Sequence, residues 1–158
     1  MTPPSPPSPK PLVVGLIVDG PLTPEALARV PHAHAAALRA LLHGGGVGAT
    51  LRFEGIVRRS ESDPEAAGRE RDLAALDYQT YDPMAQRGLE ALAASVAEHH
   101  GLRSIVALHS RGRVGVGGVS FVLEVAAPHR AETLAAVADF IDRLKQDVPI
   151  WKRAVWAE

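Results

Sequence analysis

The order of strand-like and helix-like segments is the feature that most constrains how this chain can fold. Apolar and polar residues alternate from Val47 to Val57, which predicts a strand with one buried face. Other segments have the patterns of strands or helices, and the full order is strand, helix, strand, strand, helix, strand, strand, helix. Paired strands with intervening helices favour an α+β domain over a doubly wound sheet.

The remaining elements are predicted from apolar spacing and from turn residues. Strands are expected over residues 12–18, 73–81, 104–109 and 119–126. About three helices are expected: residues 23–43 with a break at Pro31, residues 82–100 and residues 129–146. Thr23 and Asp82 each precede a proline, so both are predicted to cap a helix. Two segments are predicted to be irregular. Residues 59–71 are polar and charged and are predicted to form an exposed loop, and residues 111–118 are rich in glycine and are predicted to form a turn or bulge.

Length and composition exclude several classes of protein. The 158 residues are enough for one domain with a real core. Residues 1–11, rich in proline and serine, lack the apolar core of a signal peptide and are predicted to be a disordered arm before a single domain over residues 12–158. No apolar run approaches the roughly 20 residues that span a bilayer. The net charge of −1 gives no argument for nucleic acid or a membrane surface, so a cytoplasmic protein is expected.

Cysteine is absent, which excludes disulfides, zinc–thiolate sites and a cysteine nucleophile. Any sulfur chemistry must therefore use sulfur that another molecule carries. His32, His34 and His43 share a predicted helix, but His32 and His34 fall on different faces of it. The sequence thus predicts no metal site, and it implies no cofactor.

Cationic side chains concentrate at the ends of predicted elements. Arg58 follows the strand that ends at Val57, and His129 and Arg130 begin the last helix. A helix N-terminus offers unpaired N–H groups and the positive end of the helix dipole, so this pair suits a phosphate or a carboxylate. The alternative for the pair is that Arg130 only solvates a loop.

Lysine is scarce in this chain. Only Lys10, Lys145 and Lys152 are lysines among the 17 basic residues. Lys145 lies in the last turn of a predicted helix, where a cation is favourable for dipole reasons alone. Lys152 follows Pro149-Ile150-Trp151, which predicts a docked, ordered segment where burial would lower the pKa of the lysine. The residues alone leave two interpretations open: an active site, or two lysines that only solvate the surface.

Four ordered segments resemble the family of large, catalytic subunits of molybdopterin synthase. They are Phe53–Arg58, Leu76–Ala85, Ala127–Glu132 and Asp142–Arg153, and the Leu-Lys to Trp-Lys pattern of the last segment is the most specific. The chain differs from the usual pattern of the family in two places. Arg59-Ser60-Glu61-Ser62 replaces an Asn- or Asp-His-Asn stretch, and Ala154 replaces a common glutamate.

The resemblance implies an α/β-hammerhead fold with mixed and antiparallel sheets, and a homodimer at the centre of a heterotetramer. A small ubiquitin-like sulfur-carrier subunit would insert its C-terminal Gly-Gly tail, which ends in a thiocarboxylate, into each large subunit. The sulfur would be transferred twice to cyclic pyranopterin monophosphate, which forms the molybdopterin dithiolene in molybdenum cofactor biosynthesis.

Residue by residue, the resemblance implies that Lys145 and Lys152 are catalytic. It further implies a substrate-binding set of Ile56, Val57, Arg58, His129, Arg130, Lys145, Lys152 and Arg153. The alternative function is a non-catalytic dimeric module that binds a ubiquitin-like tail or an anionic ligand.

Overall fold

The fold is one seven-stranded sheet with helices on both faces. The computed structural model describes residues 10–28 and 32–158, so most of the predicted arm lies outside the described residues. The strands are β1 (Leu12–Asp19), β2 (Ala49–Ile56), β3 (Ser60–Asp63), β4 (Arg69–Thr80), β5 (Ser104–Gly115), β6 (Val119–Ala127) and β7 (Ile150–Trp156). Within those ranges, the α-helices are α1 (Pro24–Leu27), α2 (His32–His43), α3 (Met84–His99) and α4 (Arg130–Asp147), with a 3-10 turn at Pro64–Ala66.

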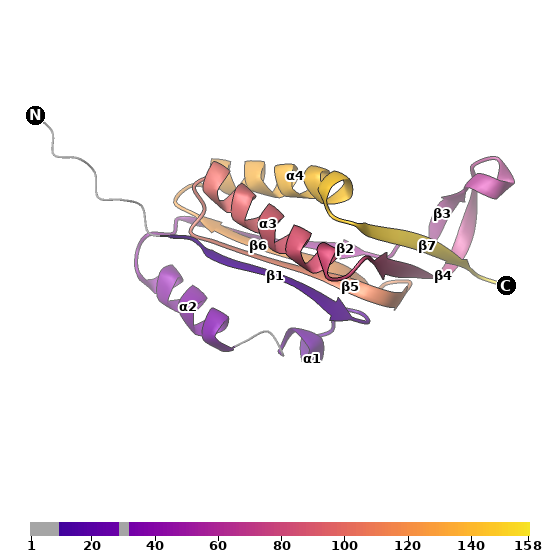
Figure 1. The fold of residues 1–158 in the computed structure, drawn as a ribbon, viewed down its shortest axis with the longest axis horizontal. Helices are drawn as coiled ribbons and strands as arrows, with labels where there is room; N and C mark the ends of the chain where they lie inside the picture. Colours follow the sequence, from indigo (N-terminus) through magenta and orange to yellow (C-terminus); the bar gives the residue numbers. More distant parts are fainter. Residues whose placement is uncertain (1–9, 29–31) are drawn as a thin grey trace, which may run out of the picture.

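The sheet is mixed. Its order is β2-β6-β5-β4-β3, with β1 also on β5 and β7 also on β4. β1 runs parallel to β5, and the other pairs are antiparallel. In Figure 1, α3 and α4 cover one face, α1 and α2 lie on the other side, and β3, β4 and β7 extend away from the helices. The predicted α+β class is confirmed.

The main core lies between the sheet and the helices α3 and α4. The buried residues of α4 are Thr133, Ala136, Val137 and Phe140, which is the spacing of one helix face. The Phe140 ring stacks on Phe121 of β6, with ring centroids 5.9 Å apart. The smallest of three buried clusters, made of Val57, Leu73, Leu76 and Val114, supports the end of the molecule formed by β4 and β7. Most buried apolar side chains thus lie under α3 and α4, and the end formed by β4 and β7 has room for polar side chains.

The prediction that residues 59–71 form a loop is wrong, because they form the hairpin of β3 and the start of β4, although most of them are exposed as predicted. Opposite charges and hydrogen bonds across the hairpin replace the apolar alternation that normally identifies a strand. Arg71 bonds Asp63 at 3.2 Å, and the Ser60 hydroxyl donates to Glu70 at 2.7 Å. The Arg71 guanidinium also lies 5.0 Å from the centre of the Trp156 ring, which attaches the hairpin to β7.

Three further expectations concern element ends. Thr23 caps α1 as predicted, accepting a hydrogen bond from the Ala26 amide at 3.2 Å, while the predicted break at Pro31 lies outside the described residues. Asp82 was the wrong cap for α3, because its carboxylate instead accepts from the Thr80 hydroxyl at 3.0 Å and pairs with Arg111. The predicted turn or bulge over residues 111–118 is mostly strand, since β5 continues to Gly115.

No helix in the part of the chain that the structure describes is long and apolar enough to cross a membrane.

Replacing Gly15 of β1 with alanine is expected to destabilise the fold by about 1–3 kcal/mol. An added Cβ would lie 2.9 Å from the Glu90 amide nitrogen and 3.0 Å from its Cα, so the backbone of α3 would have to move. Gly88→Ala is the matched control on the same helix, because its Cβ would meet only ordinary contacts from 3.7 Å. Alanine is favoured over glycine inside a helix, so Gly88→Ala is expected to stabilise by about 0.5–1 kcal/mol. Denaturant unfolding of both variants measures the two changes, and equal stability of both would contradict the close packing of β1 against α3.

Candidate functional site

The backbone on both sides of Arg58 is held by hydrogen bonds. Val57 is buried; its amide donates to the Gly118 carbonyl at 3.0 Å, and its carbonyl accepts from Gly117 at 2.9 Å. The Arg59 carbonyl accepts from the Leu73 amide at 2.8 Å. The side chain of Arg58 is nevertheless 75% exposed. The fold therefore fixes where Arg58 leaves the sheet and keeps its guanidinium accessible to a ligand.

The strand pairing of β7 with β4 places Lys152. In this ladder Lys152 lies opposite Tyr78, and Arg153 lies opposite Asp77. Successive residues of a strand face opposite sides, so Lys152 and Arg153 point away from each other. Arg153 donates to Asp77 at 3.1 Å. Of the two predicted cations in β7, only Lys152 lies on the face of Tyr78, which is also the face toward Arg58.

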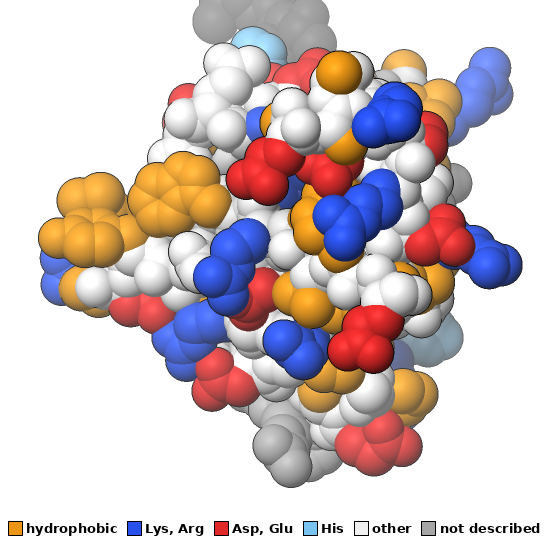
Figure 2. All heavy atoms as spheres, turned by 90° about the vertical axis from the view of Figure 1, so that its right-hand side faces the viewer, with side chains coloured by type: hydrophobic (Ala, Val, Ile, Leu, Met, Phe, Trp, Pro, Cys, Tyr) orange, Lys and Arg blue, Asp and Glu red, His pale blue; other side chains and the backbone are white. Residues whose placement is uncertain are grey.

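The carboxylate of Glu61 joins Arg58 and Lys152. One of its oxygens accepts from the Arg58 guanidinium at 3.1 Å, and the other accepts from the Lys152 ammonium at 2.9 Å. Burial of the carboxyl group opposes ionisation, but the hydrogen bonds from Lys152 and Arg58 outweigh it and lower the pKa of Glu61. Two predicted site residues from distant parts of the sequence thus meet at one point. Figure 2 faces this end of the molecule and shows basic and acidic side chains interleaved there.

Glu61 was not among the predicted site residues. The sequence signalled it only as part of a segment that departs from the family pattern. Its role depends on two ladders at once, β3 with β4 and β4 with β7. The local sequence around Glu61 cannot predict its contact with Lys152, because the two residues are 91 positions apart.

A buried polar cluster around Tyr78 supports the strand that lies opposite Lys152. The Tyr78 hydroxyl donates to Ser120 at 2.9 Å, and the Ser120 hydroxyl donates to the Gly55 carbonyl at 3.3 Å. The edge of the Tyr78 ring meets His109, with centroids 5.2 Å apart. Burial lowers the pKa of His109, whose Nδ1 donates to the Ser110 carbonyl at 2.8 Å. These contacts tie β4 to β6 and β2, and so hold the strand opposite Lys152 in place.

Lys145, His129 and Arg130 lie on α4, at its two ends. All three are exposed, and Lys145 has no acidic group within ion-pair distance among the described residues. His129 stands at the N-cap position without a side-chain capping bond. At 1.5 Å per residue, His129 and Lys145 are about 24 Å apart. One chain therefore places Lys145 at the end of α4 that leads into β7, and His129 and Arg130 far from it.

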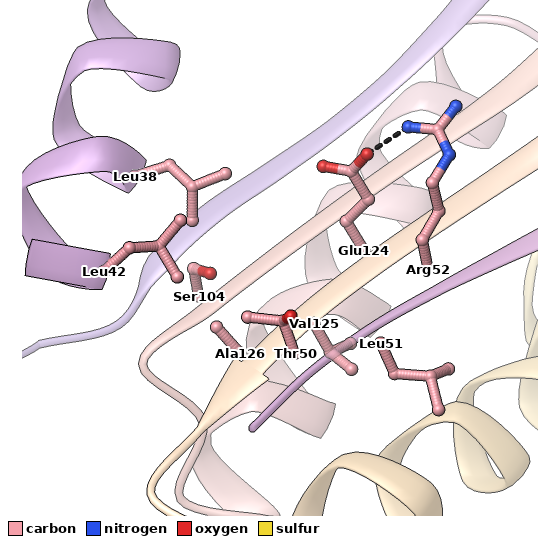
Figure 3. A pocket seen from close by; sticks show the side chains of 9 residues that line it. All are labelled: Leu38, Leu42, Thr50, Leu51, Arg52, Ser104, Glu124, Val125 and Ala126. Carbon is pink, nitrogen blue, oxygen red and sulfur yellow. Dashed lines mark hydrogen bonds and ion pairs between the residues drawn. The ribbon is translucent and has the colours of Figure 1, made fainter. Parts of the chain in front are cut away.

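A hollow of about 220 Å³ lies between α2 and the sheet. Figure 3 shows Leu38 and Leu42 of α2 facing the strands, with the ion pair of Arg52 and Glu124 beside them. None of the predicted site residues lines this hollow. Across the described residues, no three histidine, aspartate or glutamate side chains are close enough to hold a metal ion.

Comparison with known protein families finds one match over most of the chain. The model of the family described as "MoaE protein" matches residues 28–147. A molybdopterin synthase catalytic subunit of Nostoc sp. is 33% identical over 122 residues, which are 77% of this chain and 70% of that protein. One of Drosophila willistoni is 34% identical over 120 residues, which are 75% of this chain and 30% of that protein.

Two solved structures share the fold. Molybdopterin synthase from Staphylococcus aureus has a TM-score of 0.66 at 24% identity, and the match covers 91% of this chain and 92% of that one. A complex of subunits 1 and 2 of molybdopterin-converting factor from Helicobacter pylori has a TM-score of 0.62 at 23% identity, covering 90% and 88%. The sheet and helices described above are therefore the fold of these proteins.

Proposed function

Because this chain belongs to the MoaE protein family, we propose that it is the catalytic, sulfur-transferring subunit of molybdopterin synthase. In this reaction the C-terminal thiocarboxylate of a small ubiquitin-like subunit supplies sulfur to cyclic pyranopterin monophosphate, and two transfers make the molybdopterin dithiolene. The single observation that carries the proposal is the meeting of Arg58 and Lys152 at one carboxylate. The absence of cysteine fits it, since the sulfur arrives on the partner.

The two cations have distinct chemical uses. The guanidinium of Arg58 is planar and offers several N–H donors, so it suits a phosphate or the carboxyl end of the tail. The ammonium of Lys152 is a compact charge that can stabilise an oxyanion formed on the thiocarboxylate during attack. A lysine can also move protons at the pterin carbons. Lys145, which lies at the end of α4 that leads into β7, is the second lysine assigned to this chemistry, and the exposed Ile56 belongs to the substrate-binding set. The resemblance also assigns Val57 and Arg153 to that set, but Val57 is buried and Arg153 pairs with Asp77 on the other face of β7, so the proposal gives their side chains no contact with substrate.

The partner in this proposal is a small sulfur-carrier subunit with a C-terminal Gly-Gly tail. The solved complex of two molybdopterin-converting subunits from Helicobacter pylori supports such a pairing. Residues 12–158 act as one domain in this proposal, and the cytoplasmic location stays a prediction.

A second copy of the chain supplies His129 and Arg130 in this proposal. The length of α4 separates this pair from Lys145 by about 24 Å within one chain. The pair and Lys145 can therefore act on the same substrate molecule only if they come from different copies in a homodimer. Each end of a heterotetramer would then combine the lysines of one copy with the His129–Arg130 pair of the other.

Mixed dimers test this arrangement. A Lys152→Ala chain and a chain with both His129→Ala and Arg130→Ala are each expected to be inactive alone. Mixed together, they are expected to regain up to about a quarter of normal turnover, because half of the dimers are mixed and each contains one site with every group intact. Sites built within single chains would give no recovery, and that result would contradict the shared site.

The test of function is turnover by the purified chain. It is combined with a thiocarboxylated partner and cyclic pyranopterin monophosphate, and dithiolene formation is measured. Product that depends on both components supports the sulfur-transfer proposal. Binding of the partner without any product would instead support the non-catalytic dimeric module.

A further inference from the structure

The contact between Glu61 and the two cations is more enclosed than an ordinary surface ion pair. The Glu61 side chain is 19% exposed, whereas the side chains of Lys152 and Arg58 are 52% and 75% exposed. The carboxylate thus lies beneath, and the cations extend past it toward solvent. Each carboxylate oxygen takes one cation, at 3.1 Å from Arg58 and 2.9 Å from Lys152.

This geometry is that of a bound carboxylate ligand. Arg58 follows β2 and Lys152 lies in β7, so no local sequence holds the two cations together. Two like charges this close repel each other unless an anion lies between them. Glu61 supplies that anion from within the chain, and it occupies the donors that a substrate oxyanion would need.

We propose that the Glu61 carboxylate is an internal occupant of the oxyanion site formed by Arg58 and Lys152, and that an incoming carboxylate or phosphate must displace it. This inference rests on the proposed function, because it concerns the same two cations. The site carries a net charge of about +1 with Glu61 in place and would carry about +2 once the side chain turns away. Glu61 therefore weakens the binding of the anionic tail and favours its release after sulfur transfer.

The fold allows Glu61 to leave without rebuilding the sheet. Glu61 lies in β3, and β3 is hydrogen-bonded only to β4 in the sheet of the described residues. The hairpin turns at Ala67 and Gly68, both with left-handed backbone, at the exposed tip. Rotation about the side-chain bonds of Glu61 is enough to release both cations while the ladder of β3 and β4 remains.

Glu61→Gln tests the proposal, because it keeps the shape and removes the charge. The probes are a peptide that ends in Gly-Gly with a free carboxylate, the same peptide with a C-terminal amide, and inorganic phosphate. Removing the competing anion is expected to tighten the binding of either the carboxylate peptide or inorganic phosphate about tenfold at low salt. Binding of the amide peptide should not change. Tightening of the carboxylate peptide alone assigns the site to the partner's tail, and tightening of phosphate alone assigns it to the substrate.

Glu65→Gln is the matched control, since Glu65 lies in the same hairpin, is exposed, and forms no side-chain ion pair within the described residues. It should bind all three probes as the unchanged chain does. If Glu61→Gln does not fold, Glu61→Asp shortens the side chain so that it cannot bridge both cations, and it is expected to tighten binding by a smaller factor. Unchanged or weaker anion binding by the folded variants, or no binding at millimolar probe, overturns the proposal.

The outcome is separable from that of the proposed function. Tighter binding in Glu61→Gln together with no dithiolene formation by the unchanged chain would keep the internal occupant and reject sulfur transfer. Normal turnover with no tightening in Glu61→Gln would instead support sulfur transfer and reject Glu61 as an internal occupant.

Discussion

Lys152→Ala is expected to lower the rate of dithiolene formation by about 100-fold or more, the scale seen when one donor to a developing oxyanion is removed. The fold should remain, because the Lys152 side chain is half exposed and contributes to the ladder of β7 and β4 through its backbone. Lys145→Ala is expected to lose activity as well, since it is the second lysine assigned to the chemistry. Single-turnover assays with a thiocarboxylated partner measure the rates, and circular dichroism checks the fold.

The third lysine of the chain offers a control. Lys10 is exposed and lies before β1, far along the sequence from Arg58 and Lys152. Lys10→Ala removes the same charge and should leave the rate unchanged. Normal product yield from both Lys145→Ala and Lys152→Ala would reject the catalytic assignment. An equal loss in all three variants would show that overall charge, and not the site, controls the rate.

Phe140→Ala is expected to reduce the free energy of unfolding by about 3–5 kcal/mol. The Phe140 ring is fully buried between α4 and the sheet, stacked on Phe121. Alanine would leave a cavity, because the rigid sheet on one side and α3 on the other limit how far the core can collapse. Denaturant unfolding followed by circular dichroism gives the change, and a melting temperature lower by about 10 °C should accompany it.

Leu134→Ala on the same helix is the comparison. Leu134 is 57% exposed, so its truncation should change stability by no more than about 0.5 kcal/mol. A loss below about 1 kcal/mol in Phe140→Ala would contradict the central place of this ring in the core.

Sequence patterns predicted the elements that carry an apolar side, although that side of β2 is only partly buried and Phe53 is 36% exposed. β2 was predicted from its alternation and α4 from its apolar spacing, and both form close to the expected residues. Patterns failed where pairing comes from charge or from distant strands. The β3–β4 hairpin has no apolar alternation, and β7 contains charged residues in succession, so only its pairing with β4 makes it a strand.

The site was predictable in part for a similar reason. Arg58 and Lys152 could be singled out from residue type and from resemblance. Their common contact could not, because Glu61 reaches Lys152 only after β4 has paired with both β3 and β7. The placement of His129 and Arg130 likewise depends on the length and direction of α4, which set them apart from the other cations of the same chain.

The wide sequence separation of the paired strands has a consequence for folding kinetics. β1 pairs with β5, β2 with β6, and β4 with β7, so each ladder closes a long loop. Chains dominated by such non-local pairs fold in milliseconds to seconds, far more slowly than helical bundles. Because Arg58 and Lys152 come together only when the ladder of β4 and β7 has formed, a partly folded chain presents its cations singly. Recovery of anion binding during refolding should therefore follow formation of the ladder of β4 and β7, and it should not precede it.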